Sequence, residues 1–348
     1  MNNKIKTSLD DFLNVAIEHD ASDLFLISGS YPALKVNGDI GVIKNHEKLE
    51  SEKIESFLVK IMTKEEKKYF EEHLDIDFGY NYSDKNRFRV NAFVTKNGIG
   101  VSFRIIPSEI RPLENLGISD ELKKIALLRS GLVLVSGSVG SGKTTTLASI
   151  TDLINRTRRV HIVTIEDPIE YIHENKNSII SQREVGIHTK NFATGLRGAL
   201  REAADVIMVG ELRDSETMEL AITAAETGCL VISTIHTRGV SNVADRIVSN
   251  FKTEKQNQIR TQIADSLKCV IWQRLIKSID GKTRLPVTEL MFQNYAISNM
   301  IRKGLSHQIH SVIETGGEDG MHTMEQNIKF LLQNNKISPE EAKKYIAT

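Results

Sequence analysis

The sequence predicts an α/β protein, in which a small α+β domain precedes a larger domain built on a parallel sheet and a helical C-terminal region. Three observations predict it. Residues 137–144 read Gly-Ser-Val-Gly-Ser-Gly-Lys-Thr, a phosphate-binding loop (P-loop) between an apolar run and a helical one. From Gly117 onward, strand-like runs alternate with helical patterns, as they do around parallel sheets. Before residue 107, consecutive strand-like runs with short helices favour an α+β arrangement.

The small domain is predicted element by element. Apolar residues recur at helical spacing from Leu9 to Ile17, and Ser8 is a suitable N-cap, so an amphipathic helix opens the chain. Thr63-Lys64-Glu65-Glu66 forms a capping box that starts another helix. The remaining predicted elements are a helix over 51–62 and strands over 23–27, 33–36 (followed by Asn37-Gly38 as a turn), 78–82, 87–94 and 100–106.

Two prolines mark the domain boundary. Pro107 and Pro112 suit a stiff, extended linker, because proline fixes its own φ and disfavours a helix at the residue before it. We therefore expect an N-terminal domain over 1–106, a linker over 107–116, a nucleotide-binding core over 117–290 and a helical C-terminal region over 291–348.

The core domain is predicted in the same way. Its strands are expected over 132–136, 161–165, 206–209 and 230–234, and a helix over 144–154 follows the P-loop. After about residue 250 the pattern becomes helical, with a long apolar stripe through Ile259, Ile263, Leu267, Val270, Ile271 and Leu275 that suits core packing. Ser338-Pro339-Glu340-Glu341 starts a further helix, with a cap, a proline in the first turn and a carboxylate to reach back.

Composition excludes several classes of protein. The 45 basic and 45 acidic residues balance, which argues against a dedicated nucleic-acid binder with a basic stripe. Two cysteines, Cys229 and Cys269, cannot build a disulfide framework or a four-cysteine zinc site, and a reducing interior fits them. Residues 1–11 lack the apolar core of a signal peptide, and no apolar run approaches the roughly 20 residues that span a bilayer. We expect a soluble, cytoplasmic protein whose membrane contact is peripheral.

The P-loop predicts the binding of a nucleotide triphosphate. Its glycines let backbone N–H groups curl around an anion, and the following helix adds the partial positive charge of its N-terminus. Lys143 is expected to reach the β- and γ-phosphates, and the Thr144 hydroxyl to ligate Mg²⁺. The residues expected to bind ATP are Ser138, Val139, Gly140, Ser141, Gly142, Lys143, Thr144 and Thr145.

Hydrolysis needs further groups, and three candidates end predicted strands. Glu211 follows 206–209 and would orient or deprotonate the attacking water; Glu166 follows 161–165; His236 follows 230–234 and could sense the γ-phosphate. Neighbouring parallel strands end at the same edge of a sheet, which favours function over an ordinary strand-terminal acid, a solvated turn or a structural histidine. Where many P-loop proteins carry an Asp for Mg²⁺, this chain has Gly210.

The small domain offers three arginines. Arg87 and Arg89 share one face of a predicted strand, and Arg104 lies on the next strand. A solvated strand face is the ordinary outcome for such residues. Arginine supplied by another domain or subunit also commonly completes a phosphoryl-transfer site.

These motifs together resemble the secretion ATPases of bacterial pilus machines, and among them the type IV pilus retraction (twitching-motility) ATPases of the PilT family. The resemblance covers nearly the whole chain. It rests on the P-loop, on Thr164 to Glu170 (the Asp box), on Val209-Gly210-Glu211-Leu212-Arg213-Asp214, and on five shorter matches at 22–24, 36–38, 182–186, 200–202 and 224–228, with a last one at 245–248.

The resemblance implies a PAS-like N-terminal domain joined to a RecA-like ATPase domain in a ring-shaped homohexamer. By this resemblance Glu211 matches the Walker B glutamate, His236 falls in the His box, and Arg89 and Arg104 match the arginines that the N-terminal domain directs at nucleotide. It implies ATP and Mg²⁺ as cofactors and an inner-membrane pilus platform protein as partner. The location implied is the cytoplasmic face of the inner membrane, with membrane association through partners and no nucleic acid.

The chain departs from the family pattern at a few positions. Cys229 stands where the His box usually starts with a histidine, and Ala204 precedes Asp205 where proline is common. In the retraction motif Ala-Ile-Arg-Asn-Leu-Ile-Arg-Glu, Ser298 and Lys303 replace an arginine and a glutamate. The departures at Cys229 and Ser298 keep open an accessory retraction ATPase that works beside a primary motor.

Other functions are weighed against retraction. Extension or secretion ATPases of the same superfamily usually carry a four-cysteine zinc site and a longer N-terminal region. A RecA-like nucleic-acid motor would need a basic, aromatic-interleaved groove, which is absent from this sequence. A scaffold that binds ATP without turnover would not need Glu211.

Overall fold

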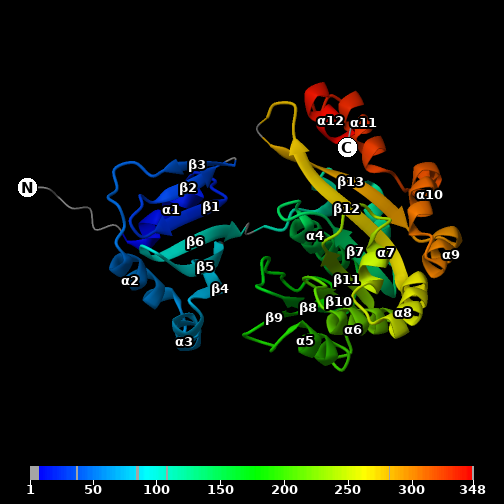
Figure 1. Cartoon of the computed structure of the whole chain (residues 1–348), viewed down its shortest axis with the longest axis horizontal. Coiled ribbons are helices and arrows are strands. Elements are labelled where there is room, and N and C mark those ends of the chain that lie inside the picture. The colour runs from blue at the N-terminus through cyan, green and yellow to red at the C-terminus, as the bar shows by residue number, and fades with distance from the viewer. Residues whose placement is uncertain (1–7, 37, 84–85, 107–108, 282, 347–348) are drawn as a thin grey trace, which may run out of the picture. The chain divides into compact units, whose positions relative to one another are not determined.

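A computed structural model describes residues 8–36, 38–83, 86–106, 109–281 and 283–346 of the chain (Figure 1). The chain divides into two compact units, one of Met1–Glu109 with Glu170–Ile172 and one of Ile110–Ile169 with His173–Thr348. The division between residues 109 and 110 lies inside the predicted linker, and Pro107 lies outside the described residues.

The first unit is a six-stranded antiparallel sheet with three helices. Its strands lie in the order β3-β2-β1-β6-β5-β4. The strands are β1 (Asp23–Ile27), β2 (Ala33–Val36), β3 (Asp39–Val42), β4 (Asp75–Asn81), β5 (Arg87–Thr95) and β6 (Gly98–Ile106), and the helices are α1 (Leu9–Glu18), α2 (Ser51–Ile61) and α3 (Lys64–His73).

Local sequence explains where these helices begin. Ser8 caps α1 and Thr63 forms a capping box with Glu66, both as predicted; the structure adds a capping box between Ser8 and Asp11. Asn37 of the predicted turn after β2 lies outside the described residues, and β3 was not predicted from the sequence.

The core of the first unit lies on one face of the sheet. Side chains alternate along β5, so Phe88, Val90 and Ala92 are fully buried in the cluster that also contains Phe12 of α1 and Phe57 of α2. Arg89 points to the other face. The helices therefore cover one face of the sheet, and the arginines of β5 lie on the opposite face.

The second unit is built on a seven-stranded sheet in the order β13-β12-β7-β11-β10-β8-β9. All neighbouring strands are parallel except β12 and β13. The strands are β7 (Gly131–Ser136), β8 (His161–Glu166), β9 (Ile179–Glu184), β10 (Val206–Val209), β11 (Leu230–Ile235), β12 (Leu267–Lys277) and β13 (Arg284–Phe292).

Helices surround this sheet and continue to the end of the described chain. They are α4 (Lys143–Thr157), α5 (Phe192–Ala199), α6 (Ser215–Glu226), α7 (Val243–Val248), α8 (Thr253–Ser266), α9 (Tyr295–Lys303), α10 (Ile309–Thr315), α11 (Met324–Gln333) and α12 (Pro339–Ile346), with 3₁₀ turns at Leu113–Asn115 (η1), Asp120–Leu127 (η2), Ser306–Gln308 (η3) and Gly317–Asp319 (η4). The predicted helical C-terminal region is confirmed by α9 to α12.

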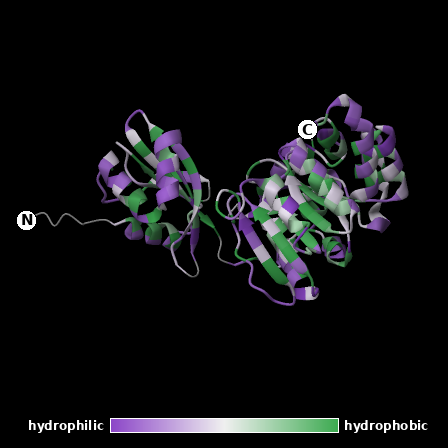
Figure 2. Cartoon of the chain, turned by 90° about the horizontal axis from the view of Figure 1, so that it is seen from below, coloured by the Kyte–Doolittle hydropathy of each residue, from purple (hydrophilic) through white to green (hydrophobic). Residues whose placement is uncertain are grey.

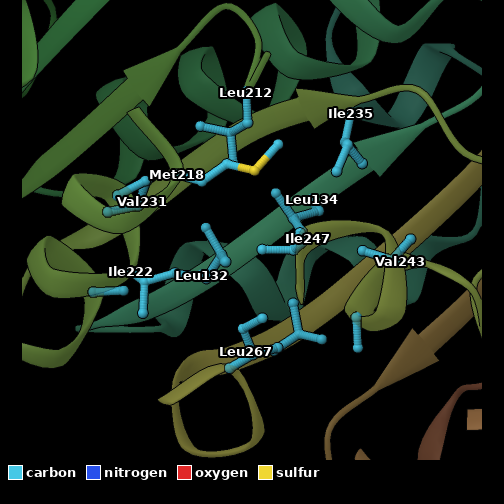
Figure 3. Close-up of a cluster of buried hydrophobic side chains, with 14 of the residues drawn as sticks. Leu132, Leu134, Leu212, Met218, Ile222, Val231, Ile235, Val243, Ile247 and Leu267 are labelled. Atoms are coloured by element: carbon cyan, nitrogen blue, oxygen red, sulfur yellow. The ribbon is translucent and has the colours of Figure 1, made fainter. Parts of the chain in front are cut away.

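Both faces of the second sheet are buried, which explains the continuous apolar runs in its strands. Val133 and Val135 of β7 pack with α4 and η2 on one face. Leu132 and Leu134 pack with α6 and α7 on the other face (Figure 3). Colouring by hydropathy shows hydrophobic residues concentrated on the strands and hydrophilic residues on the surrounding helices (Figure 2).

The prediction of a continuous helix after residue 250 is wrong beyond Ser266. Residues 267–277 form β12, which pairs with β7 in parallel, and β13 follows it. Cys269, Val270 and Ile271 are fully buried. A short apolar run buried on both sides lacks a distinctive period, so its residues fit a helical stripe as well as a strand. Strand β9 was also not predicted from the sequence.

The predicted linker is not extended throughout. Residues 111–116 lie against α4, where the Ser149 Oγ donates to the Arg111 carbonyl at 2.6 Å and Arg156 pairs with Glu114 at 2.7 Å. The Pro112 carbonyl accepts from the Asn115 N–H at 2.9 Å, because the φ of proline also suits the start of a 3₁₀ turn.

The cap of the last helix is also different in detail. The Glu341 N–H donates to the Ser338 hydroxyl at 3.1 Å, as a cap requires. The Glu341 carboxylate accepts instead from the Lys277 N–H at 3.3 Å and from Lys344 at 2.6 Å. It thereby ties α12 to the end of β12.

Candidate functional site

The candidate site lies along the carboxyl edge of the second sheet. The register pairs Ser136 with Ile235, Ser233 with Val209, and Val209 with Ile165, so β7, β11, β10 and β8 end side by side. The P-loop, His236 and Glu211 follow the ends of β7, β11 and β10, and Glu166 is the last residue of β8. Neighbouring strands lie about 4.8 Å apart, which makes this edge a continuous row of candidate groups.

The P-loop occupies residues 137–142 between β7 and α4. Gly137 and Gly142 adopt φ of 150° and 86°, and a Cβ added there would lie 2.5 Å from the Gln273 carbonyl and 2.8 Å from its side-chain nitrogen. Glycine is therefore required at both positions. Ser138, Val139 and Gly140 form the exposed crest of the loop, and a Cβ on Gly140 would meet nothing within 4 Å.

Lys143 folds back over the loop. Its ammonium group donates to the carbonyls of Gly137 at 3.1 Å and Ser138 at 2.9 Å. The next residues, Thr144 and Thr145, lie partly buried in the first turn of α4. The lysine charge is thus held beside the loop N–H groups, where an anionic phosphate would bind.

Two buried hydroxyls support phosphate binding at this loop. The Oγ atoms of Ser136 and Ser141 are buried and have no hydrogen-bond partner within the part of the chain that the structure describes. Buried polar groups of folded proteins are normally hydrogen-bonded, and an unpaired one is costly. An acceptor such as a phosphate oxygen would satisfy them, so the residues present fit a phosphate ligand.

The donor set also fits Mg²⁺, with few protein ligands. Among the described residues, no group of three His, Cys, Asp or Glu side chains could hold a metal ion. Mg²⁺ commonly keeps several waters and binds substrate phosphates with only one or two protein ligands. The Thr144 hydroxyl beside a phosphate loop is a ligand of that kind.

Gln273 of β12 supports the P-loop through two side-chain hydrogen bonds. Its side chain is buried, donates from Nε2 to the Ser141 carbonyl at 2.7 Å, and accepts at Oε1 from the Thr146 hydroxyl at 2.8 Å. Sequence reasoning missed this residue because it lies on a strand that was predicted as helix. Its one signal is a glutamine directly after the apolar run Cys269 to Trp272.

We expect Gln273→Glu to weaken nucleotide binding at least about tenfold. The substitution keeps the size of the side chain, loses the donor to Ser141 and places a negative charge beneath the phosphate loop. Calorimetric titration with ADP measures the affinity, and thermal melting reports folding. Gln258→Glu, at an exposed position on α8, is the matched control and should bind normally. Unchanged ADP affinity in Gln273→Glu would show that the hydrogen bonds of Gln273 do not support the loop.

Glu211 and His236 lie together on this edge. The Glu211 carboxylate is largely buried, and its Oε2 lies 3.8 Å from His236 Nε2, whose side chain is half exposed. The other oxygen, Oε1, lies 2.5 Å from Arg213 Nε. Arg213 was not among the site residues predicted from the sequence.

Glu166 is near these residues in the backbone but its carboxylate has other partners. A Cβ on Gly210 would lie 3.6 Å from the Glu166 Cα, so the two strand ends are adjacent. The buried Glu166 carboxylate accepts from the Thr164 hydroxyl at 2.8 Å and from Gln182 Nε2 at 3.1 Å. The described bonds hold it inside the sheet edge, with Gln182 of β9 as its support.

His173 is a buried histidine close to this edge. Neither ring nitrogen has a hydrogen-bond partner in the described part of the chain, although its backbone N–H donates to Gln182 Oε1 at 2.8 Å. Burial lowers the pKa of His173 to about 4, so the ring is neutral near pH 7. It therefore adds no positive charge for binding phosphate.

The two arginines of the first unit lie side by side. Arg89 of β5 and Arg104 of β6 are register partners. Arg89 pairs with Asp77 at 3.3 Å, and Arg104 pairs with Asp23 at 2.9 Å. Like charges directly opposite each other on a sheet are unfavourable, and the two aspartates offset that repulsion. The arrangement concentrates guanidinium groups on the face that the helices leave open.

The Cys229 departure lies at the opposite edge of the second sheet. Cys229 directly precedes β11, and its carbonyl accepts from the Gly131 N–H at 3.0 Å. Gly131 is the first residue of β7, so this contact lies at the amino ends of the two strands. Its thiol lies 3.2 Å from the Ala204 carbonyl, and burial raises its pKa. The missing imidazole therefore leaves the carboxyl edge unaffected.

The Ser298 departure is buried in the C-terminal region. Its hydroxyl accepts from Gln293 Nε2 at 2.7 Å.

Among the helices that the structure describes, none combines the length and the hydrophobicity needed to span a bilayer.

Comparison with known proteins gives concordant matches. The family model described as "Type II/IV secretion system protein" matches residues 2–336. The "Type IV pilus retractation ATPase PilT" of Pseudomonas aeruginosa is 43% identical over 335 residues, covering 96% of this chain and 97% of the relative. The "Twitching motility protein" of Neisseria gonorrhoeae is 43% identical over 313 residues, covering 90% of this chain and 83% of the relative.

A solved structure agrees over the same span. The crystal structure of the pilus retraction motor PilT with bound ADP has a TM-score of 0.88 and 39% identity, and the match covers 97% of each chain. The order of strands and helices described above is therefore that of a secretion ATPase.

Proposed function

We propose, from the premise that this chain belongs to the type II/IV secretion system protein family, that it hydrolyses ATP and powers the retraction of type IV pili. The observation that carries the proposal is the row of groups on one sheet edge. A P-loop with Lys143 folded over it lies on the same sheet edge as His236, which follows β11, and Glu211, which follows β10. Relatives named for pilus retraction and twitching motility match over nearly the whole chain.

The P-loop is the proposed site of ATP. The loop N–H groups and Lys143 bind the β- and γ-phosphates, with Ser138 to Thr145 forming the cradle. The ADP bound in a related motor supports nucleotide binding by this chain. Thr144 is the proposed protein ligand of Mg²⁺, which neutralises charge on the phosphates when bound.

Glu211 is the proposed general base. Its carboxylate would orient the attacking water and accept its proton, with His236 nearby as a donor to the γ-phosphate. Glu166 is the second acid proposed for this edge. Its carboxylate accepts hydrogen bonds from Thr164 and Gln182. These bonds favour a structural role at the sheet edge over direct proton transfer.

The assembly is proposed from the family resemblance. Six copies would form a ring at the cytoplasmic face of the inner membrane, bound to the pilus platform protein, with membrane association through partners and no nucleic acid. The paired arginines of the first unit, Arg89 and Arg104, are the proposed charges that complete the ATP site in the ring.

Arg104→Ala and Arg89→Ala are each expected to lower ATP turnover of assembled rings at least about tenfold, because each removes charge that offsets the transferring phosphoryl group. Phosphate release by size-selected rings measures the loss. Lys96→Ala, at an exposed turn between β5 and β6, is the control and should remain fully active. A variant that keeps full activity would mark that arginine as a plain surface residue.

The proposed function is tested first with the purified chain. Phosphate release from ATP is measured with and without single-stranded DNA. ATP turnover that is unchanged by DNA supports the pilus motor, and strong stimulation of turnover by DNA favours a nucleic-acid motor. Binding of ATP without any turnover would favour a scaffold.

A deletion of the gene then tests the direction of force. Cells that keep surplus surface pili which cannot withdraw support retraction. Bald cells would contradict it and favour the extension ATPase. Normal withdrawal in the presence of a second retraction ATPase would favour the accessory role.

A further inference from the structure

Arg213 is the closest charged neighbour of Glu211 that the structure records. Its Nε lies 2.5 Å from Glu211 Oε1, whereas His236 Nε2 lies 3.8 Å from Oε2. The two carboxylate oxygens therefore have different surroundings. Oε1 is bound by a cation, and Oε2 faces an imidazole beyond hydrogen-bond distance.

The loop that carries both residues is fixed through its backbone. The Gly210 N–H donates to the Ile165 carbonyl at 2.8 Å, and the Leu212 N–H donates to the Thr234 carbonyl at 3.0 Å. Asp214 then caps α6 by accepting from the Thr217 N–H at 2.8 Å. The backbone on either side of Glu211 and Arg213 is thus attached to neighbouring strands and to a helix. The position of the Glu211 carboxylate then depends mainly on the side-chain torsions of Glu211.

A glutamate on a fixed backbone still has three side-chain torsions. Its carboxylate is useful as a base only when one oxygen is held toward the water. Burial limits Glu211, whose side chain is 16% exposed, but among the described residues its closest charged contact is the ion pair with Arg213. Arg213 itself is 70% exposed, so solvent screens the pair and the ion pair contributes little to folding.

We propose that Arg213 is a positioning residue that fixes the rotamer of Glu211 by binding Oε1, so that Oε2 is the oxygen presented to the attacking water. The inference rests on the proposed function, since it assigns Glu211 as the base. Arg213 acts through Glu211 and not by binding the nucleotide.

The first test is the kinetics of Arg213→Ala and Arg213→Lys. Arg213→Ala should lower kcat at least about tenfold and leave KM for ATP within about twofold, because it misplaces the base without touching the phosphate loop. Arg213→Lys should recover part of the loss, since it keeps the charge but not the planar guanidinium. Melting temperature and ADP affinity should match the wild type.

Lys255→Ala is the matched control. Lys255 forms an exposed ion pair with Glu219 of α6, at 2.9 Å, on the helix that follows the same loop. Its loss removes a similar surface pair without changing the contacts of Glu211, so kcat should stay at the wild-type value.

The second test combines Arg213→Ala with Glu211→Gln. If Arg213 acts only through Glu211, the double variant should turn over ATP at the rate of Glu211→Gln alone. Additive losses would overturn the proposal. So would a rise in KM at constant kcat, which indicates contact with ATP, or an unchanged or increased kcat in Arg213→Ala.

The same measurements separate this inference from the proposed function. Turnover by the wild type together with its loss in Glu211→Gln upholds the proposed base, whatever Arg213→Ala does. Failure of the wild type to hydrolyse ATP, or full turnover by Glu211→Gln, removes the proposed base and overturns the positioning role with it.

Discussion

Lys143→Ala is expected to abolish ATP turnover, with a loss of at least about a hundredfold in kcat/KM. The Lys143 ammonium is held over the P-loop by the carbonyls of Gly137 and Ser138, so the substitution removes a positive charge from the place where phosphate would bind. Both carbonyls belong to a loop with an exposed crest, so water can replace the ammonium and the fold should persist.

Three measurements check this result. Phosphate release gives turnover, calorimetric titration gives nucleotide affinity, and thermal melting shows that the variant is folded. Lys252→Ala, an exposed lysine at the start of α8, serves as control and should be fully active. Wild-type turnover by Lys143→Ala would contradict the proposed ATP site itself.

Glu211→Gln is expected to bind ATP with near wild-type affinity and to hydrolyse it at least about a hundredfold more slowly. Glutamine has nearly the same shape, but it carries no negative charge and cannot accept the proton of the attacking water. The pair with Arg213 is lost as well, at little cost to folding because Arg213 is largely exposed.

Single-turnover assays separate binding from hydrolysis in this variant. Glu219→Gln, which removes an exposed carboxylate from α6, is the control and should keep full turnover. Slow hydrolysis with tight ATP binding supports Glu211 as the base. Unaltered hydrolysis would assign that role to another group on the edge.

Mixed rings extend this result to the assembly. Subunits with Lys143→Ala and subunits with Glu211→Gln are each expected to be inactive, so turnover in a mixture would require Lys143 and Glu211 from two different subunits to form one site. A mixture as inactive as its components would place Lys143 and Glu211 of each site in a single chain.

The strands of the second sheet show how far sequence reasoning reaches. The predicted strands over 132–136, 161–165, 206–209 and 230–234 correspond to β7, β8, β10 and β11, because each is a compact apolar run bounded by loop residues. Strand β12 escaped prediction since its apolar residues also fit a helical stripe. Its pairing with β7 depends on residues more than a hundred positions away.

The candidate site divides in the same way. Lys143 and Thr144 were predicted because the geometry of a P-loop is local and is written in consecutive residues. Gln273 was missed because its role arises from contact between distant segments. Arg213 was missed for another reason: it stands two residues from Glu211, but a sequence does not reveal which side chains pair.

The sequence by itself determined the anion-binding loop, its helix and the acids at the strand ends, because backbone preferences and apolar patterns act over short stretches of chain. Only the tertiary structure decided which strands are neighbours, and hence that Glu211 lies between Arg213 and His236 while Glu166 is held by Gln182. The physical reason is that strand order and side-chain pairing are set by burial and hydrogen bonding between distant segments, which local preference does not encode.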